Sequence, residues 1–283
     1  MRRAIEVTLA GIALLACLVR PAAAQQRPMV TEDPLTIGAG RILVEAGLEF
    51  QNDALYPASG LVGDLWRVPV VGLSFGLGSM AELQIDGGFQ RLTIRERVGG
   101  PLEDMVTASG ATTSVVEDVV VATKIRLGSA EPEGLSYGFR FATKLPNASN
   151  ESGLGLDTTD FYASVLLGKT SQTIRFAGNV GLGILGDPTR GDNQNDVLTY
   201  GLSLAKALTN KAEIIGEING RLSTAEGEPP AGTETRSAMR FGARYTLGAG
   251  RVDGAVIIGI TDYDPGFGFT VGYTHVFNAF VPK

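Results

Sequence analysis

The chain has 283 residues, of which 44% are hydrophobic and 19% are charged, and its formal net charge at pH 7 is −6. The acidic balance argues against nucleic acid as a partner, and the modest charged fraction does not suit a disordered chain. One cysteine, Cys17, is present, so a disulfide framework and a cysteine-rich metal site are both excluded.

The first residues predict export. Arg2 and Arg3 precede an apolar run at 7–18, and three alanines at 22–24 close the segment. This is the order of a secretory signal, and its apolar core of about 12 residues is shorter than the roughly 20 residues that a membrane-spanning helix needs. We therefore predict a signal peptide over 1–24. Its removal takes three positive charges and one negative charge away and changes the formal charge from −6 to −8.

The same segment allows one alternative. Residues 14–17 loosely resemble a lipoprotein box, in which Cys17 would be lipidated and would become the mature N-terminus. Cleavage after Ala24, where the small residues lie at the ordinary distance, is the reading that we prefer. The mature chain then has no cysteine.

Residues 25–40 are polar and contain Pro28 and Pro34, and we predict a periplasmic N-terminal lead-in there. From residue 41 the hydropathy alternates with period two, so that in 41–51 one face is apolar and the other is mostly polar. Eleven further segments repeat the alternation. They lie at 66–77, 82–90, 119–127, 135–141, 161–167, 174–184, 198–204, 214–222, 239–247, 256–260 and 269–277. The second strand, which contains Pro69, and the eleventh are the least regular.

The connections between these segments alternate between short and long. Short links lie at 78–79, 129–134, 169–172, 208–211 and 248–251. Long links lie at 53–64, 98–114, 146–158, 187–194 and 223–236, and a last one at 261–265 is shorter. This rhythm is typical of outer-membrane barrels, whose periplasmic turns are short and whose outer loops are long.

The pattern predicts an all-β protein in which residues 41–283 form one closed antiparallel transmembrane β-barrel of about 12 strands in the outer membrane. Its partners would be outer-membrane lipid and lipopolysaccharide, the barrel-assembly machinery and a small-molecule solute. A soluble β-sandwich or periplasmic barrel would show the same period with its apolar face turned inward. Strands of about 9–12 residues, the loop rhythm and the charged second face favour the membrane barrel.

The polar face supplies the candidate functional residues. Charged side chains of both signs would face the lumen, where they can form cross-strand pairs in a narrow, wet interior. The predicted lumen-lining residues are Glu82, Asp86, Lys124, Arg126, Arg140, Arg175, Glu213, Glu217, Arg221, Arg240 and Arg244, with Asp253 beside them.

No motif predicts catalysis, a metal site or a cofactor. Glycines at 181, 183 and 186 match a dinucleotide-binding spacing, but they lie within a predicted strand instead of a turn that opens a helix. His275 is the sole histidine, and it shares the apolar side of the last strand with two aromatic residues, which suits an interfacial girdle better than a general base. An acidic loop at 187–196 follows no complete calcium-loop pattern.

Two resemblances add to this reading. The final strand, 270–277, resembles the C-terminal signal by which barrel proteins are recognised for assembly, although His275 replaces one aromatic residue and 278–283 extend past the usual end. Residues 117–169 resemble the outer-membrane family named for the meta pathway of phenol degradation. The residues that carry this resemblance are 118–121, 124–127, 143–146, 153–155 and 159–160. It implies a barrel that passes or binds small hydrophobic compounds.

We therefore expect a passive outer-membrane channel or uptake protein for small molecules, aromatic or hydrophobic ones among them, with no enzymatic activity. The alternative is a non-conducting structural or surface-interaction barrel whose lumen is filled by its own side chains. A soluble periplasmic barrel ranks below both, and an enzymatic barrel would have to do without a histidine other than His275.

Overall fold

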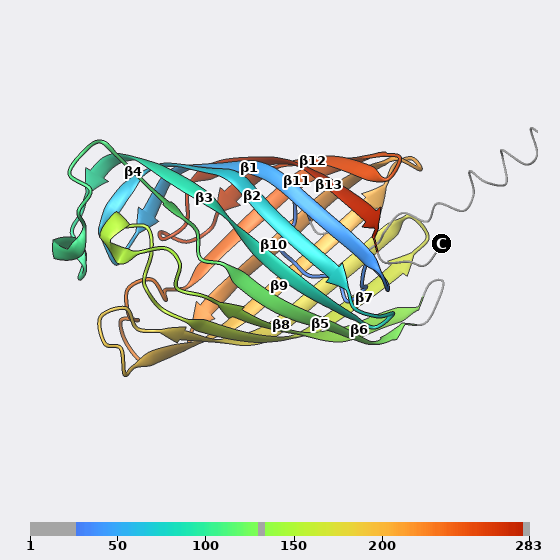
Figure 1. Ribbon diagram of the computed structural model, residues 1–283, viewed down its shortest axis with the longest axis horizontal. Coiled ribbons are helices and arrows are strands. Elements are labelled where there is room, and N and C mark those ends of the chain that lie inside the picture. The colour runs from blue at the N-terminus through green and yellow to red at the C-terminus, as the bar shows by residue number, and fades with distance from the viewer. Residues whose placement is uncertain (1–26, 130–133, 280–283) are drawn as a thin grey trace, which may run out of the picture.

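The structure is a computed structural model that describes residues 27–129 and 134–279. The predicted signal peptide, Cys17, most of the link at 129–134 and the last four residues lie outside these ranges. The described chain forms thirteen strands and two short 3₁₀ helices (Figure 1). The strands are β1 (Arg41–Tyr56), β2 (Leu61–Gly76), β3 (Ala81–Arg97), β4 (Thr112–Val116), β5 (Val120–Ser129), β6 (Leu135–Lys144), β7 (Asp160–Ser171), β8 (Ile174–Gly186), β9 (Gln194–Ala207), β10 (Ala212–Ser223), β11 (Arg236–Leu247), β12 (Gly250–Gly259) and β13 (Phe267–Asn278), and the helices are η1 (Glu103–Met105) and η2 (Asn150–Ser152).

The strands form one closed antiparallel sheet. Consecutive strands pair along the chain, and β1 pairs with β13 in an unbroken register from Arg41↔Asn278 to Asn52↔Phe267. Both β4 and β5 pair with β3, so they are two parts of one barrel strand that is interrupted at 117–119. The prediction of a closed barrel of twelve antiparallel strands is confirmed.

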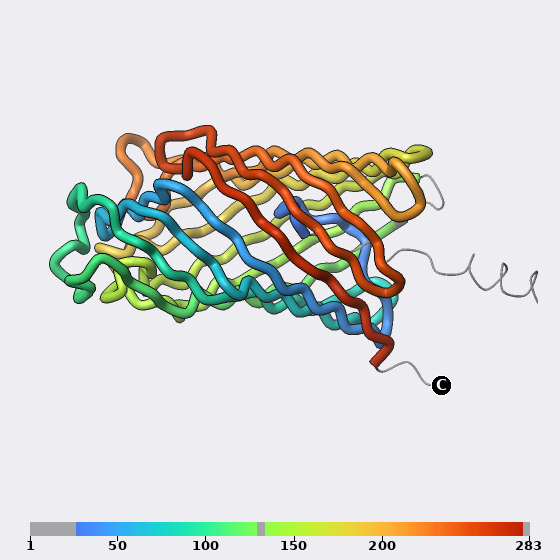
Figure 2. The backbone as a smooth tube through the Cα atoms, turned by 90° about the horizontal axis from the view of Figure 1, so that it is seen from above, coloured from blue at the N-terminus to red at the C-terminus, as the bar shows by residue number. Residues whose placement is uncertain are grey.

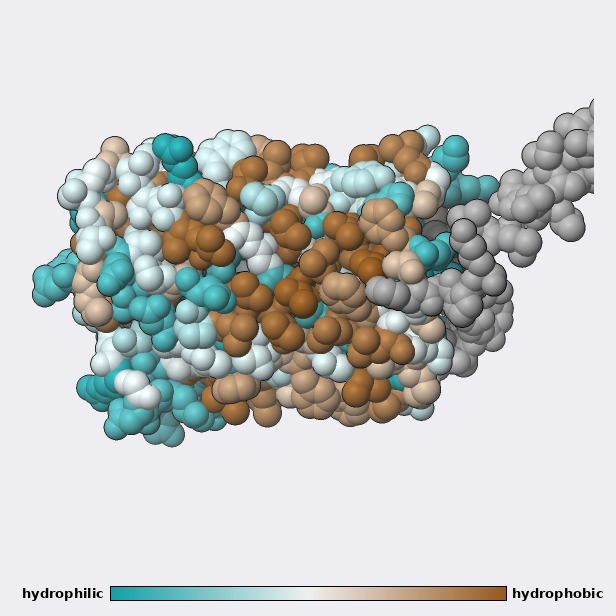
Figure 3. Space-filling view, in the orientation of Figure 1, coloured by the Kyte–Doolittle hydropathy of each residue, from teal (hydrophilic) through white to brown (hydrophobic). Residues whose placement is uncertain are grey.

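The period-two alternation separates the two surfaces of the sheet. Side chains of the predicted apolar face, such as Val165 and Val180 on neighbouring strands, point outward and are 40% and 50% exposed. Apolar side chains form a broad brown region over the middle of the barrel, and hydrophilic side chains gather at the end that carries the long connections (Figure 3). No helix in the described ranges has the length and apolarity to cross a membrane.

The two ends of the barrel differ as predicted. One end, here called the turn end, holds the connections 77–80, 172–173, 208–211 and 248–249 and the ends of β1 and β13. The other, here called the loop end, holds the connections 98–111, 145–159, 187–193, 224–235 and 260–266. The loop 145–159 folds toward the β1–β2 hairpin, because Ser59 donates a hydrogen bond to the carbonyl of Gly153 at 2.7 Å.

The predicted long loop at 53–64 is wrong. The strands β1 and β2 extend to Tyr56 and from Leu61, so that only 57–60 connect them. A register shift between Gln51 and Ala54 hides the alternation from a strict period-two reading. Beyond the shift, inward apolar side chains resume and pack together, and they form the cluster Ala54, Leu61, Leu65, Leu92 and Leu154.

The ladder is interrupted at two further places. Residues 112–114, predicted as the end of a loop, belong to β4, which pairs with the outer half of β3. Strand β2 continues through Pro69, with a register shift between Arg67 and Val70. Proline has no N–H to give to a ladder, and a bulge is one of the few places in a sheet that accepts it.

The N-terminal segment does not lead up to the barrel from outside. Residues 27–40 run inside it, and the first described residues lie within the outline of the wall (Figure 2). For the described residues 27–40, this corrects the periplasmic lead-in predicted for 25–40. The physical reason is charge and hydrogen bonding: the segment brings two carboxylates and a series of backbone N–H groups to a lumen face that holds their partners. We call residues 27–40 the luminal segment.

The outward apolar face gives a first prediction. Val180 lies near the middle of β8, and replacing it with arginine should lower the free energy of unfolding in lipid vesicles by about 2–4 kcal/mol, because a charge at mid-membrane loses its hydration. The control is Leu208→Arg. Leu208 lies in a connection at the turn end and is 57% exposed, compared with 50% for Val180. This change should lower the free energy of unfolding by about 1 kcal/mol or less. Urea unfolding of both variants measures this, and equal costs would argue against a lipid-facing belt.

Candidate functional site

The luminal segment follows the inner wall around most of the barrel. Going backward from β1, the backbone N–H of Ile37 donates to Glu82 of β3 at 2.8 Å, and Asp33 pairs with Arg175 of β8 at 2.6 Å. Farther on, Thr31 reaches β10 and Arg27 reaches β13. The luminal segment, fourteen residues long, thus contacts strands on opposite sides of the barrel.

The adjacent carboxylates of Glu32 and Asp33 hold the middle of the luminal segment. Glu32 accepts from Arg140 Nε at 3.0 Å and from Lys124 Nζ at 3.3 Å. The Lys124 ammonium is fully buried and lies 2.9 Å from Glu82. A buried ammonium of this kind needs carboxylate partners, since an uncompensated charge away from water costs several kcal/mol. The luminal segment therefore supplies one of the two anions that Lys124 requires.

The first residues of the luminal segment are held through backbone groups and through the side chains of Arg27 and Thr31. The Glu217 carboxylate accepts the N–H groups of Val30 and Thr31 and the Thr31 hydroxyl, at 2.8–3.0 Å. The Arg27 guanidinium donates to Thr270 at 2.8 Å, and the carbonyl of Arg27 accepts from Arg244 Nε at 2.9 Å. Hydrogen bonds that involve a charged group are worth about 1.5–3 kcal/mol each, so these contacts hold the segment firmly.

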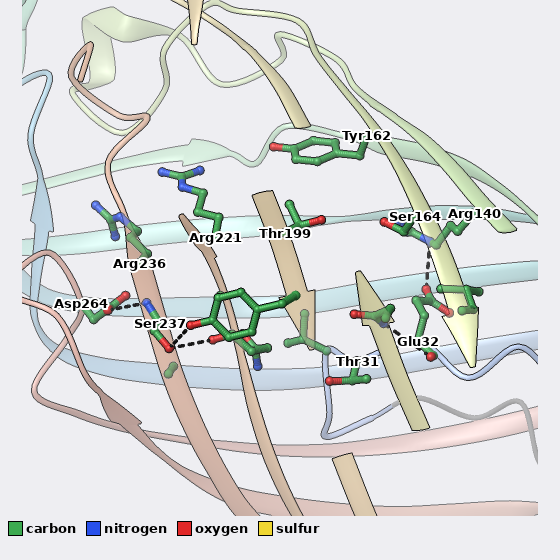
Figure 4. A pocket seen from close by; sticks show the side chains of 17 residues that line it. Thr31, Glu32, Arg140, Tyr162, Ser164, Thr199, Arg221, Arg236, Ser237 and Asp264 are labelled. Carbon is green, nitrogen blue, oxygen red and sulfur yellow. Dashed lines mark hydrogen bonds and ion pairs between the residues drawn. The ribbon is translucent and has the colours of Figure 1, made fainter. Parts of the chain in front are cut away.

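Three cavities that are lined by described residues lie in the barrel, and each shares lining residues with the next. The luminal segment contributes to the walls of the second and the third. The first, of about 270 Å³, lies under the loop 145–159 and has Leu55, Leu65 and Leu154 in its wall. The second, of about 340 Å³, is lined mainly by polar side chains of β7–β11 (Figure 4). Arg221 and Arg236 border both of these cavities.

The third cavity, of about 270 Å³, lies between the luminal segment and β1–β3. Val30, Glu32 and Arg140 line both the second and the third cavity. The luminal segment and its ion pair with Arg140 therefore stand between these two cavities. A solute that moved from one to the other would have to pass these three residues.

The predicted lumen-lining residues fall into three groups. Six of them contact the luminal segment: Glu82, Lys124, Arg140, Arg175, Glu217 and Arg244. Three line the cavities: Asp86, Arg221 and Arg240. Two lie near the turn end: Arg126, which donates to the carbonyl of Ser79 at 2.8 Å, and Glu213, which is 3.6 Å from Arg244. Asp253 lies 3.6 Å from Arg27.

Sequence reasoning missed several charged residues of the interior. Glu49 lies 3.0 Å from Arg67 and 3.1 Å from Arg240, and Arg67 also pairs with Glu117. Glu49 lies on the polar face of the first predicted strand, so its parity was a usable signal. Arg67 lies at the register shift around Pro69, and Arg236 lies at the end of the predicted link 223–236. Neither position has a period-two pattern around it that would indicate an inward side chain.

The motifs that were set aside have structural roles. His275 lies on the outer side of β13, with its ring 4.3 Å from that of Phe277 and its Nδ1 3.1 Å from the Tyr273 hydroxyl. The glycine-spaced residues at 181–186 lie within β8. Asp187 accepts hydrogen bonds from Thr189 and Arg190 within its own loop. In the described ranges, no three His, Cys, Asp or Glu side chains gather as metal ligands would.

Comparison with known proteins identifies the class by fold. No model of a protein family matches the chain, and no curated protein matches it in sequence. A crystal structure of an outer-membrane channel from Pseudomonas putida F1 is similar, with a TM-score of 0.60 and 14% identity over 87% of this chain and 98% of that one. The porin NanC is similar with a TM-score of 0.52 and 10% identity over 83% and 98%. The chain has the fold of outer-membrane β-barrels.

At 14% and 10% identity, the likeness to these two structures shows a shared fold alone. The resemblance to the meta-pathway family remains a prediction, since no family model supports that name.

The buried lysine gives a second prediction. Lys124→Met should lower the free energy of unfolding by roughly 3–5 kcal/mol, because Glu82 and Glu32 lose their shared cation. Adding Glu82→Gln should restore part of that loss. The matched control is Lys206→Met on the outer side of β9, which should cost nothing measurable. Urea unfolding in lipid vesicles tests all three, and equal stabilities for the two lysine variants would contradict the buried-pair account.

The luminal segment gives a third prediction. In a Cys17→Ala background, Met29→Cys should react slowly with a bulky maleimide, because Met29 lies inside the barrel beside the third cavity. Adding Asp33→Asn should speed labelling by about tenfold or more, since Arg175 loses a charge-assisted bond worth about 1.5–3 kcal/mol. Asp53→Asn, which removes an aspartate from an exposed pair with Arg95, is the control. Fast labelling of the Met29→Cys variant that keeps Asp33 would place the luminal segment outside the lumen.

Proposed function

We propose that the protein is a passive outer-membrane channel for small molecules, aromatic or hydrophobic ones among them. The observation that carries the proposal is a series of three cavities inside a closed barrel, in which each cavity shares lining residues with the next. The likeness in fold to an outer-membrane channel and a porin supports a passive role. The apolar outer face supports a location in the outer membrane, with lipid and lipopolysaccharide around it and assembly by the barrel machinery.

In this proposal the luminal segment is the constriction. The side chains that border the second and third cavities, Glu32 and Arg140, form an ion pair across the path. Passage then depends on the width left beside this pair, or on movement of the segment. The lumen charges of both signs give no dominant field, so selectivity comes from the size of the path and from local groups.

The competing function is a non-conducting barrel with a structural or surface-interaction role. The specific observation in its favour is the dense packing around the luminal segment, where Lys124 and Glu82 are completely or almost completely buried. Such a barrel would use its charged interior for stability alone. His275 does not support an enzymatic role, because its side chain lies on the outer side of β13 beside Tyr273 and Phe277.

Conductance separates the two functions and forms our fourth prediction. Wild-type protein in planar bilayers should give small stable currents, and the double variant Glu32→Gln/Asp33→Asn should increase them severalfold, because the luminal segment loses the anions that hold it to Lys124, Arg140 and Arg175. Asp53→Asn at the loop end should leave the current unchanged. Silence of both the wild type and the double variant, together with no liposome swelling by small solutes, would favour the non-conducting barrel.

A further inference from the structure

Two arginines lie at the boundary between two cavities, of which the first is lined mainly by apolar residues and the second mainly by polar ones. Arg221 of β10 and Arg236 of β11 line the first and the second cavity alike. In the second cavity they lie on the side away from Glu32 (Figure 4). Most side chains that line the first cavity are apolar, with Ala54, Leu65 and Leu154 among them, and Gln51 and Tyr56 add polar groups. An anionic group at this boundary would therefore have cations beside it and an apolar pocket directly outside.

These guanidinium groups differ from most others in the lumen. Arg67, Arg140 and Arg175 each form an ion pair with a carboxylate. Arg221 instead donates to the carbonyls of Glu234 and Gly232, at 2.9 and 2.6 Å, and Arg236 donates to the carbonyl of Leu55 at 3.1 Å. Neither guanidinium forms an ion pair with a carboxylate of the described residues.

Arg236 also carries an unused donor. Its Nε is buried and has no hydrogen-bond partner among the described residues. A buried guanidinium nitrogen without a partner loses its hydration without compensation. A ligand oxygen would remove this cost, and the planar edge of a guanidinium matches the two oxygens of a carboxylate.

Two carboxylates lie in the same region, and both serve the loops. Glu234 accepts the N–H of Gly232 at 2.7 Å, and Asp264 accepts the N–H of Ser237 and the hydroxyl of Thr261 at 2.8 and 2.7 Å. They hold the connections 224–235 and 260–266 in place beside the two arginines. Neither carboxylate forms an ion pair with Arg221 or Arg236 in the described ranges, and Glu234 Oε2 has no hydrogen-bond partner there.

We propose that Arg221 and Arg236 bind the carboxylate of a small organic acid whose apolar body lies in the first cavity. This inference rests on the proposed channel function and names a substrate class for it. The shared border sets the geometry: the acid group meets the two guanidinium groups, and the hydrocarbon part contacts the leucines under the loop 145–159. Cavities of about 300 Å³ are at the lower end of the size that ligand sites show, which suits a small solute.

Equilibrium binding tests the inference, and it is our fifth prediction. Calorimetric titration of the detergent-solubilised barrel with benzoate and with benzyl alcohol compares two solutes that share a ring and differ in charge. Benzoate should bind at least tenfold more tightly. Arg236→Gln and Arg221→Gln should each weaken benzoate binding by about tenfold or more, as expected for the loss of a charge-assisted bond. Binding of benzyl alcohol should change little.

The controls separate a binding defect from a folding defect. Arg95→Gln removes an exposed arginine at the loop end and should bind benzoate as the wild type does. Arg236→Lys keeps the charge but not the planar edge, and it should retain part of the affinity in a barrel that keeps its β-sheet circular dichroism. Equal affinity for the two solutes, no binding of benzoate by the wild type, or benzoate binding that survives both glutamine substitutions would overturn the inference.

The result is independent of conduction. If neutral solutes swell liposomes while benzoate does not bind, the channel function stands and the acid site fails. If benzoate binds through the two arginines while no solute crosses the barrel, the acid site stands and the channel function fails.

Discussion

The absence of hydrogen-bond partners in hydrocarbon is the constraint on which this structure depends. Every N–H and C=O of a sheet that crosses a membrane must find its partner within the sheet, so the first and last strands have to meet. The ladder between β1 and β13 fulfils this condition over twelve consecutive residue pairs. Closure then divides the side chains of each strand into an outward set and an inward set, and the inward set includes charged residues such as Lys124 and Arg140.

The interior solves the resulting electrostatic problem by pairing. Buried charges are costly unless opposite charges and hydrogen bonds surround them, and Lys124, Arg140 and Arg175 all meet carboxylates. Part of that neutralisation comes from the luminal segment and not from the wall itself. Arg221 and Arg236 are the contrast, because their edges meet neutral carbonyls at the border of two cavities. The difference in pairing marks where the interior can accept a solute.

The sequence predicts the wall well and the contents of the lumen poorly. Period two is a local property, so the strands and the inward parity of residues such as Glu217 can be read from a window of a few residues. The contacts of the luminal segment are not local: Asp33 meets a residue 142 positions away, and Thr31 one 186 positions away. A polar stretch with two prolines carries no period that reveals such partners. Where the ladder shifts, as between Gln51 and Ala54, even the local signal fails.

The position of the luminal segment also bears on the order of assembly. Its anchoring groups on β8, β10 and β13 are synthesised long after it, and Arg27 meets a side chain 243 residues farther along the chain. Closing such long loops is entropically unfavourable until neighbouring strands have already brought the ends together. The earliest of these residues to be made is therefore among the last to reach its final place, enclosed as the sheet curls around it.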